Sequence, residues 1–170
     1  KYDLNEDAIK PYFSQEDVHN GLCTVVNKLY GITLTPCDSI SVYNKDVKTY
    51  IVKDADGSLL GVFYSDYMPR ASKRSGAWMS NFREQQEGVR PLIYNVASFT
   101  KPAGDLPALL TIDEARTMYH EFGHALHGLL TQCKYKGVSG TSVAQDFVEL
   151  PSQIMEHWAV EPEVLKLYAK

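Results

Sequence analysis

The chain has 170 residues, of which 44% are hydrophobic and 22% charged, with a formal net charge of −4; these values are typical of a globular domain with one sizeable core. The mild acidity and the lack of a basic run argue against binding to the phosphates of nucleic acids. No apolar stretch approaches the roughly twenty residues that a membrane span needs, and the first ten residues are too polar for a secretory signal, so no membrane partner is expected.

Cysteine usage bears on the compartment. Cys23, Cys37 and Cys133 are odd in number, widely spaced and form no C-x-x-C pair, which argues against a disulfide framework and favours a reducing compartment. We therefore expect a cytoplasmic protein, with export of the intact protein left open. Because the chain lacks an initial methionine and stops within a helix-like pattern, residues 1–170 are expected to be a single-domain fragment, truncated at both ends.

Residues 3–31 are predicted to be helical. Ser14 is the expected N-cap of the longer segment, with Asp17 at the third helical position, and Gly31 is expected to end it. Apolar residues recur along this segment at helical spacing: Val18, Leu22, Val25, Val26, Leu29 and Tyr30. His19 lies off that stripe, so we interpret it as a solvent-facing histidine, not a metal ligand.

The period of the hydrophobic pattern changes in residues 46–66. Two segments rich in valine, isoleucine and tyrosine flank Ala-Asp-Gly there and predict a β-hairpin. The polar stretch that follows carries a cluster of basic residues, Arg70, Lys73, Arg74 and Arg83. It is interpreted as a solvated connector, with an anion site for a substrate carboxylate as the alternative. Residues 91–99 predict a third strand, and an edge of this small sheet would suit an extended peptide.

Residues 111–130 predict the helix that carries the chemistry. Thr111 and Glu114 form a capping-box pattern at its start. A helix advances roughly 100° per residue, so the four-residue step from His120 to His124 lets both imidazoles reach one cation. Glu121 can then reach a water molecule on that cation without being a ligand, which is the arrangement that a zinc hydrolase needs.

Two ligands do not complete a zinc site. His127 lies roughly 10 Å along the axis from His120, too far for one tetrahedral ion. The longer H-E-x-x-H-x-x-G-x-x-H pattern also fails, because residue 127 is histidine and residue 130 is leucine. Until a third ligand is identified, the less favoured alternative is two core histidines and a surface glutamate on an ordinary amphipathic helix.

A second helix is predicted to begin near Ser142, where Gln145 would complete another capping box, and Pro151 is expected to kink it. Glu149 on this helix follows His124 by 25 residues and is the best candidate for the third ligand. Asp146, one turn earlier, could accept a hydrogen bond from a ligating imidazole. Spacing alone leaves rival ligands open: Glu156, His157, Glu161 and Glu163.

The segments YHEFGHALHGLL, VSGTSVAQDFVELPSQIMEHW, YNVASFTKP and RSGAWMSNF resemble the thimet oligopeptidase family of zinc metallopeptidases over most of the chain. Motif by motif, the resemblance implies that His120, His124 and Glu149 bind one zinc ion and that Glu121 is the catalytic glutamate. GAWMSNF and PSQIMEHWA are more similar to the peptidyl-dipeptidase branch. The implied fold is α+β and mainly helical, with a zincin-like helix pair beside a small sheet, in a larger and mostly helical protein.

This resemblance implies zinc-dependent hydrolysis of short peptides by a monomeric protein, with release of C-terminal dipeptides. An endo-acting oligopeptidase of the same family is the alternative. A non-catalytic metal- or peptide-binding module is a second alternative, although Glu121 between the histidines argues against it. In the family, a downstream segment supplies further contacts to the transition state, so weak activity or none is expected of these 170 residues by themselves.

Overall fold

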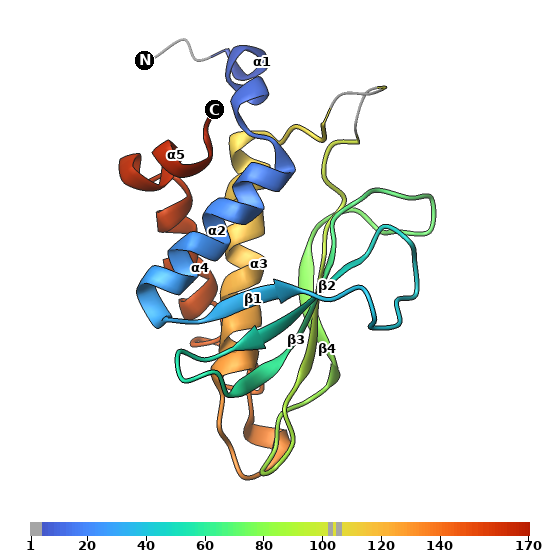
Figure 1. Cartoon of the computed structure of the whole chain (residues 1–170), viewed down its shortest axis with the longest axis vertical. Coiled ribbons are helices and arrows are strands. Elements are labelled where there is room, and N and C mark those ends of the chain that lie inside the picture. The colour runs from blue at the N-terminus through green and yellow to red at the C-terminus, as the bar shows by residue number, and fades with distance from the viewer. Residues whose placement is uncertain (1–4, 102–103, 105–106) are drawn as a thin grey trace.

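The computed structural model describes residues 5–101, 104 and 107–170. Its helices gather on one face of a five-stranded sheet, as Figure 1 shows. The helices are α1 (Glu6–Ile9), α2 (Gln15–Tyr30), α3 (Ile112–Leu130), α4 (Leu150–Ala159) and α5 (Pro162–Tyr168), with 3-10 turns at Lys10–Tyr12 and Lys136–Val138. The strands are β1 (Thr33–Pro36), β2 (Lys48–Lys53), β3 (Leu59–Asp66), β4 (Trp78–Arg83) and β5 (Leu92–Val96).

The sheet has the strand order β1-β2-β3-β5-β4 and is mixed, because β3 and β5 run parallel while the other neighbours are antiparallel. The hairpin of β2 and β3 and the strand β5 confirm the sequence predictions. The two edge strands, β1 and β4, were not predicted. An edge strand pairs on one side only, so it can form from a short or polar segment whose pattern gives little signal. Because the five strands form a full layer, the prediction that the chain is mainly helical is not confirmed.

Helix α2 has the predicted ends. The Ser14 side chain accepts a hydrogen bond from the Asp17 backbone N–H at 3.1 Å, and Gly31 closes the helix with a φ of 74°. That left-handed conformation suits glycine because other residues meet a steric penalty there.

The interpretation of His19 as a solvent-facing residue is wrong. Its side chain is buried, its ring centroid lies 5.0 Å from that of Tyr50, and Nε2 lies 3.6 Å from Cys23 Sγ. Burial, together with the charge of Lys48, lowers the pKa of His19 to about 4. The rings of Tyr50 in β2 and Tyr67 after β3 lie beside His19, which the helical period of the sequence could not reveal.

Two of the four residues of the basic cluster, Arg70 and Lys73, belong to an internal ion-pair group. Asp66 is fully buried and accepts hydrogen bonds from Arg70 and Tyr43, and the Lys73 ammonium lies 2.8 Å from its Oδ1. Burial acts to raise the pKa of Asp66, but these partners outweigh it and hold that pKa below its usual range. Arg70 and Lys73 are thus engaged within the fold and are neither a free anion site nor a purely solvated connector.

Helix α3 forms the centre of the core. Its apolar side chains are buried against the sheet and the other helices: Ala115, Met118, Tyr119, Phe122, Ala125, Leu126 and Leu129. Phe122 meets Phe63 of β3 edge to face, with ring centroids 5.0 Å apart, an arrangement that adds to the stabilisation from burial. None of the described helices combines the length and the apolarity that crossing a membrane requires.

The helix predicted to begin near Ser142 begins later. Residues 142–149 form bends and turns, and α4 starts at Leu150 with Glu149 at its N-cap position. Pro151 therefore lies in the first turn, where a backbone N–H is not needed, and it does not kink the helix. Glu149 therefore lies at the start of a helix instead of within one.

Candidate metal centre

Helix α3 holds His120, Glu121 and His124 rigidly because both its capping and its packing are complete. Thr111 and Glu114 form the predicted capping box, and Glu114 also accepts the Thr100 backbone N–H at 2.9 Å. The imidazoles of His120 and His124 stand on the same face of the helix, with ring centroids 5.0 Å apart. The predicted helix and its capping box are confirmed.

Glu149 faces both imidazoles from the start of α4. Its Oε2 atom lies 3.3 Å from His120 Nε2 and 3.1 Å from His124 Nε2. Ser152 donates a hydrogen bond to the same oxygen at 2.7 Å and so orients the carboxylate. His120, His124 and Glu149 form the one group of potential metal ligands found in the described part of the chain.

The spacing of these atoms fits a small cation. Zinc bonds to nitrogen and oxygen are about 2.0–2.1 Å long, so a tetrahedral ion separates its ligand atoms by about 3.3 Å. The two nitrogen-to-oxygen distances of 3.1 and 3.3 Å match that separation. Two imidazoles and one carboxylate also form a donor set that leaves a fourth position open.

The protonation states of the group suit metal binding. Burial lowers the pKa of His124, which favours the neutral imidazole. The hydrogen bond from Ser152 and the two nearby histidines hold the pKa of Glu149 below its usual range. A neutral imidazole and an ionised carboxylate are the forms that bind a metal ion.

Glu121 is not part of this ligand group. Its side chain is 7% exposed, and its Oε2 atom has no hydrogen-bond partner. Burial and the charge of Glu149 raise the pKa of Glu121 to about 7, against opposing contributions from His120 and the Met79 backbone. The carboxyl group lines a cleft of about 450 Å³ together with His120, Ala77 and Glu156. It is thus a buried acid–base group beside the candidate ligands, with one of its two oxygens unpaired.

The structure assigns the contact expected of Asp146 to another residue. Glu156 Oε1 lies 2.5 Å from His120 Nδ1, and its Oε2 is 3.5 Å from Arg116. Asp146 is exposed. Among the described residues it forms no hydrogen bond to His120 or His124, and His124 Nδ1 has no partner. Glu156 follows Glu149 by seven residues, a spacing that places two residues on the same face of a helix. This was the sequence signal that could have indicated Glu156 as the carboxylate at His120.

The remaining sequence candidates lie elsewhere. His157, Glu161 and Glu163 are exposed and do not belong to the ligand group of the described residues. His127 faces an apolar groove between α3 and α4, with its ring 6.1 Å from that of Phe147. It is therefore not brought to the candidate centre.

Replacing Glu156 with glutamine is expected to weaken metal binding by about 10- to 100-fold, because the charged acceptor that orients and polarises the His120 ring is lost. Titration of zinc against a chromophoric chelator measures this affinity in the intact protein. The matched control is Asp146→Asn, which should leave the affinity unchanged. The reverse result for the two variants would restore Asp146 as the supporting carboxylate.

Gly123 allows α3 and α4 to approach closely enough for the site to form. A Cβ atom at this position would lie 2.5 Å from Ser152 Cα and 2.6 Å from the carbonyl oxygen of Pro151. Both contacts involve backbone atoms, so a side chain here must push the start of α4 away from α3. Glu149 lies directly before that start, and its distance to the imidazoles depends on this contact.

The substitution Gly123→Ala is therefore expected to lower the free energy of unfolding by roughly 1–3 kcal/mol and to weaken zinc binding. Urea unfolding and zinc content measure the two effects. Gly137→Ala serves as the control, because a Cβ atom at Gly137 meets nothing within 4 Å and its backbone needs no positive φ. Equal behaviour of the two variants would show that helix contact at Gly123 does not support the site.

The edge strand β4 borders this cleft. It pairs only with β5 among the described strands, and Met79 near its start is close enough to affect the pKa of Glu121. Ala77, directly before β4, lines the cleft with His120. An open strand edge thus runs beside the candidate metal centre.

Comparison with known proteins gives consistent matches along the chain. The sequence model of Peptidase family M3 matches residues 1–170. The dipeptidyl carboxypeptidase of Salmonella typhimurium is 46% identical over 173 residues, covering 100% of this chain and 25% of that protein. Oligopeptidase A of Escherichia coli is 41% identical, covering 96% of this chain and 25% of that protein. The probable cytosolic oligopeptidase A of Arabidopsis thaliana is 40% identical, with coverage of 100% and 26%. The chain spans about a quarter of the length of these relatives.

Proposed function

The chain belongs to peptidase family M3, and from this premise we propose that residues 1–170 form the zinc-binding core of an enzyme that hydrolyses short peptides. The observation that carries the proposal is the convergence of His120, His124 and Glu149, with a carboxylate oxygen of Glu149 at the ligand spacing of a tetrahedral ion from both imidazoles and Glu121 Oε2 unpaired beside them. Each of these residues comes from a motif that resembles those of the thimet oligopeptidases. Together they form the HExxH helix and following glutamate of a zincin-like site.

In this proposal, His120 and His124 of α3 and Glu149 at the start of α4 hold one zinc ion. A bound zinc ion supplies a Lewis acid that polarises a peptide carbonyl and makes water more acidic. Glu121 removes a proton from the attacking water and then delivers it to the leaving amine. Burial raises the pKa of Glu121, which makes its carboxylate a stronger base than that of an exposed glutamate. Glu156 keeps the His120 ring in position through Nδ1.

The substrate is proposed to lie extended along the edge of β4. That edge offers backbone groups of a strand with one free side, and the cleft at Ala77, His120 and Glu121 lies next to it. Pairing of an extended peptide with a sheet edge gives affinity that depends little on sequence. Short peptides of varied sequence are accordingly the proposed substrates.

We further propose that the intact enzyme releases C-terminal dipeptides, since two of the similar relatives bear the name dipeptidyl carboxypeptidase. The second candidate is internal cleavage, favoured by similarity to proteins named oligopeptidase A. A cytoplasmic, monomeric enzyme is part of the same proposal, and one similar relative is named a probable cytosolic oligopeptidase.

Product analysis distinguishes the two modes of cleavage. The intact protein is incubated with a peptide of about ten residues that carries a free C-terminus, and with the same peptide blocked as its C-terminal amide. Dipeptide release from the free peptide alone is the expected result, because a dipeptidyl carboxypeptidase must recognise the terminal carboxylate. Internal fragments of equal yield from both peptides would instead establish the oligopeptidase. Failure to cut either peptide, with zinc bound, would favour the non-catalytic module.

A further inference from the structure

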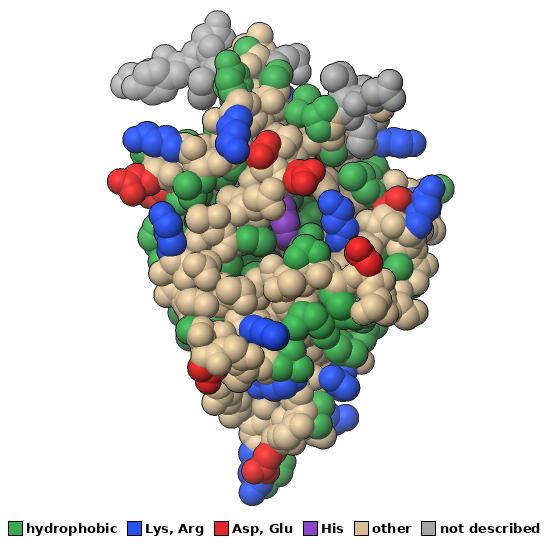
Figure 2. Space-filling model, viewed as in Figure 1, with side chains coloured by type: hydrophobic (Ala, Val, Ile, Leu, Met, Phe, Trp, Pro, Cys, Tyr) green, Lys and Arg blue, Asp and Glu red, His purple; other side chains and the backbone are tan. Residues whose placement is uncertain are grey.

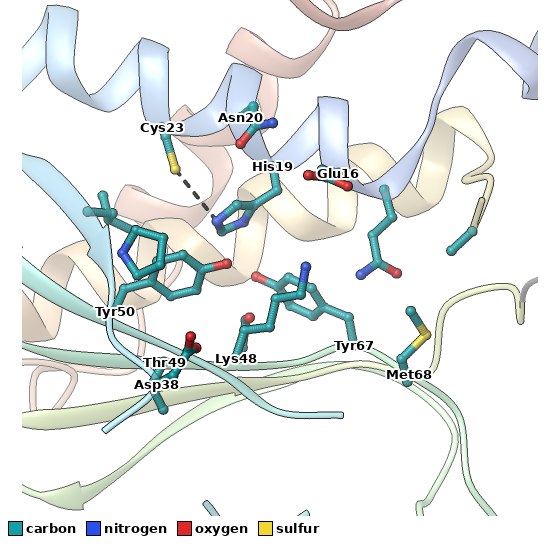
Figure 3. A pocket seen from close by; sticks show the side chains of 15 residues that line it. Glu16, His19, Asn20, Cys23, Asp38, Lys48, Thr49, Tyr50, Tyr67 and Met68 are labelled. Atoms are coloured by element: carbon teal, nitrogen blue, oxygen red, sulfur yellow. Dashed lines mark hydrogen bonds between the residues drawn. The ribbon is translucent and has the colours of Figure 1, made fainter. Parts of the chain in front are cut away.

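A second cavity of about 500 Å³ lies between α2 and the part of the sheet formed by β1, β2 and β3. It shares no lining residue with the metal centre or with the cleft beside Glu121. Figure 2 shows this face as a hollow with a histidine side chain inside it and with acidic and basic side chains around it. Figure 3 shows the lining side chains, which come from α2, β2 and the segment after β3.

Three residues that line the cavity each carry a buried polar atom without a partner. Tyr67 is 4% exposed and its hydroxyl is unpaired; His19 is 9% exposed and its Nδ1 is unpaired. The Gln15 Oε1 atom is also buried without a partner. Burying such groups unpaired typically costs about 1–3 kcal/mol each. Three of them lining one cavity, among the residues that the structure describes, indicate a site for a polar ligand.

The floor of the cavity carries the phenol hydroxyls of Tyr50 and Tyr67 beside the His19 ring. The His19 ring lies 5.0 Å from that of Tyr50 and 6.5 Å from that of Tyr67. In Figure 3 the two phenol hydroxyls point toward one another beneath the imidazole, and the Lys48 side chain reaches toward the same space. Burial raises the pKa of Tyr50 to about 12, so this phenol keeps its proton and can donate it. The Cys23 thiol lies at Nε2 of His19, and Nδ1 has no partner.

Charges of both signs surround this floor. Lys48 supplies an ammonium group whose charge reaches His19. Glu16 and Asp38 line the same cavity from α2 and from the segment after β1, and both are exposed at its mouth. A simple anion would meet two carboxylates here, and a simple cation would meet a lysine. A molecule that carries one charge of each sign matches both.

We propose that this cavity binds a small zwitterion with one ammonium and one carboxylate group, a free amino acid or a dipeptide, with its carboxylate toward Lys48 and the two tyrosine hydroxyls and its ammonium toward Glu16 and Asp38. The volume of about 500 Å³ lies within the range of about 300–1,000 Å³ that is usual for small-molecule sites. Dipeptides would come from the hydrolysis proposed above, and this source rests on the proposed function. Free amino acids would serve as ligands whether or not the protein is a peptidase.

Isothermal titration of the zinc-loaded intact protein with alanyl-alanine tests the site. We expect a binding component that the variants Lys48→Met and Tyr67→Phe weaken by roughly tenfold or more, because each loses a donor to the carboxylate. The matched controls are Lys53→Met, at the other end of β2, and Tyr64→Phe, within β3 and outside the cavity. Both controls should bind the dipeptide like the unmodified protein. Thermal unfolding of all four variants checks that each is folded.

Further ligands separate the chemical requirements and the source. N-acetyl-alanyl-alanine amide carries neither charge and should not bind. Titration with alanine, compared with alanyl-alanine, shows from the two affinities whether the site prefers an amino acid or a dipeptide. Equal binding of the uncharged compound, or equal losses in the pocket variants and in their controls, would overturn the proposal. Peptide hydrolysis is measured in parallel. If a pocket variant loses dipeptide binding but retains hydrolysis, the cavity and the metal centre are separate sites. If the unmodified protein binds the dipeptide but hydrolyses no peptide, this inference stands while the proposed function fails.

Discussion

Replacing Glu121 with glutamine is expected to lower kcat for peptide hydrolysis by roughly 10²- to 10⁴-fold, the contribution typical of a positioned general base. The amide keeps the size of the carboxyl group but cannot take a proton from water. Glu121 lies outside the group formed by His120, His124 and Glu149, so zinc content should stay at one ion per chain. Steady-state kinetics and metal analysis of the same preparation measure both quantities.

The comparison variant for this experiment is Glu87→Gln, which changes an exposed glutamate away from the cleft. It should keep both activity and zinc. If Glu121→Gln lost its zinc along with its activity, the carboxylate would be a ligand or a structural support and not the base. If the variant kept full activity, another group would have to accept the proton.

The substitution Glu149→Ala is expected to release the metal. It removes one of three ligands and leaves two imidazoles on one helix, so the loss of zinc affinity should exceed the about 10- to 100-fold that follows loss of an outer hydrogen-bonding partner. Hydrolysis should fall in parallel at limiting zinc and recover in part when zinc is added in excess. Equilibrium dialysis against a zinc buffer gives the affinity directly.

Glu161→Ala and Glu163→Ala are suitable controls, because both glutamates were rival ligands by sequence and both are exposed outside the ligand group. They should bind zinc like the unmodified protein. Retention of full zinc affinity by Glu149→Ala, together with a loss in either control, would move the third ligand to α5 and contradict the geometry at His120 and His124.

The sequence by itself determined the features that depend on neighbours within a few residues. The capping box of Thr111 and Glu114 marked the start of α3, and the four-residue step from His120 to His124 placed two imidazoles on one face. The same holds for α2, whose ends at Ser14 and Gly31 are local hydrogen-bonding and backbone effects. These interactions form wherever the helix forms, so the pattern of residues was sufficient.

Only the tertiary structure decided which distant groups meet. The predicted third ligand Glu149 does lie at the imidazoles, but from the N-cap of α4 and not from within a helix, because Gly123 lets the two helices touch. The carboxylate on His120 is Glu156 instead of Asp146. His19 is buried beside the rings of Tyr50 and Tyr67, which other segments of the chain supply. Such contacts depend on the packing of elements far apart in the chain, and the spacing of residues within one segment does not specify which other segment it will contact.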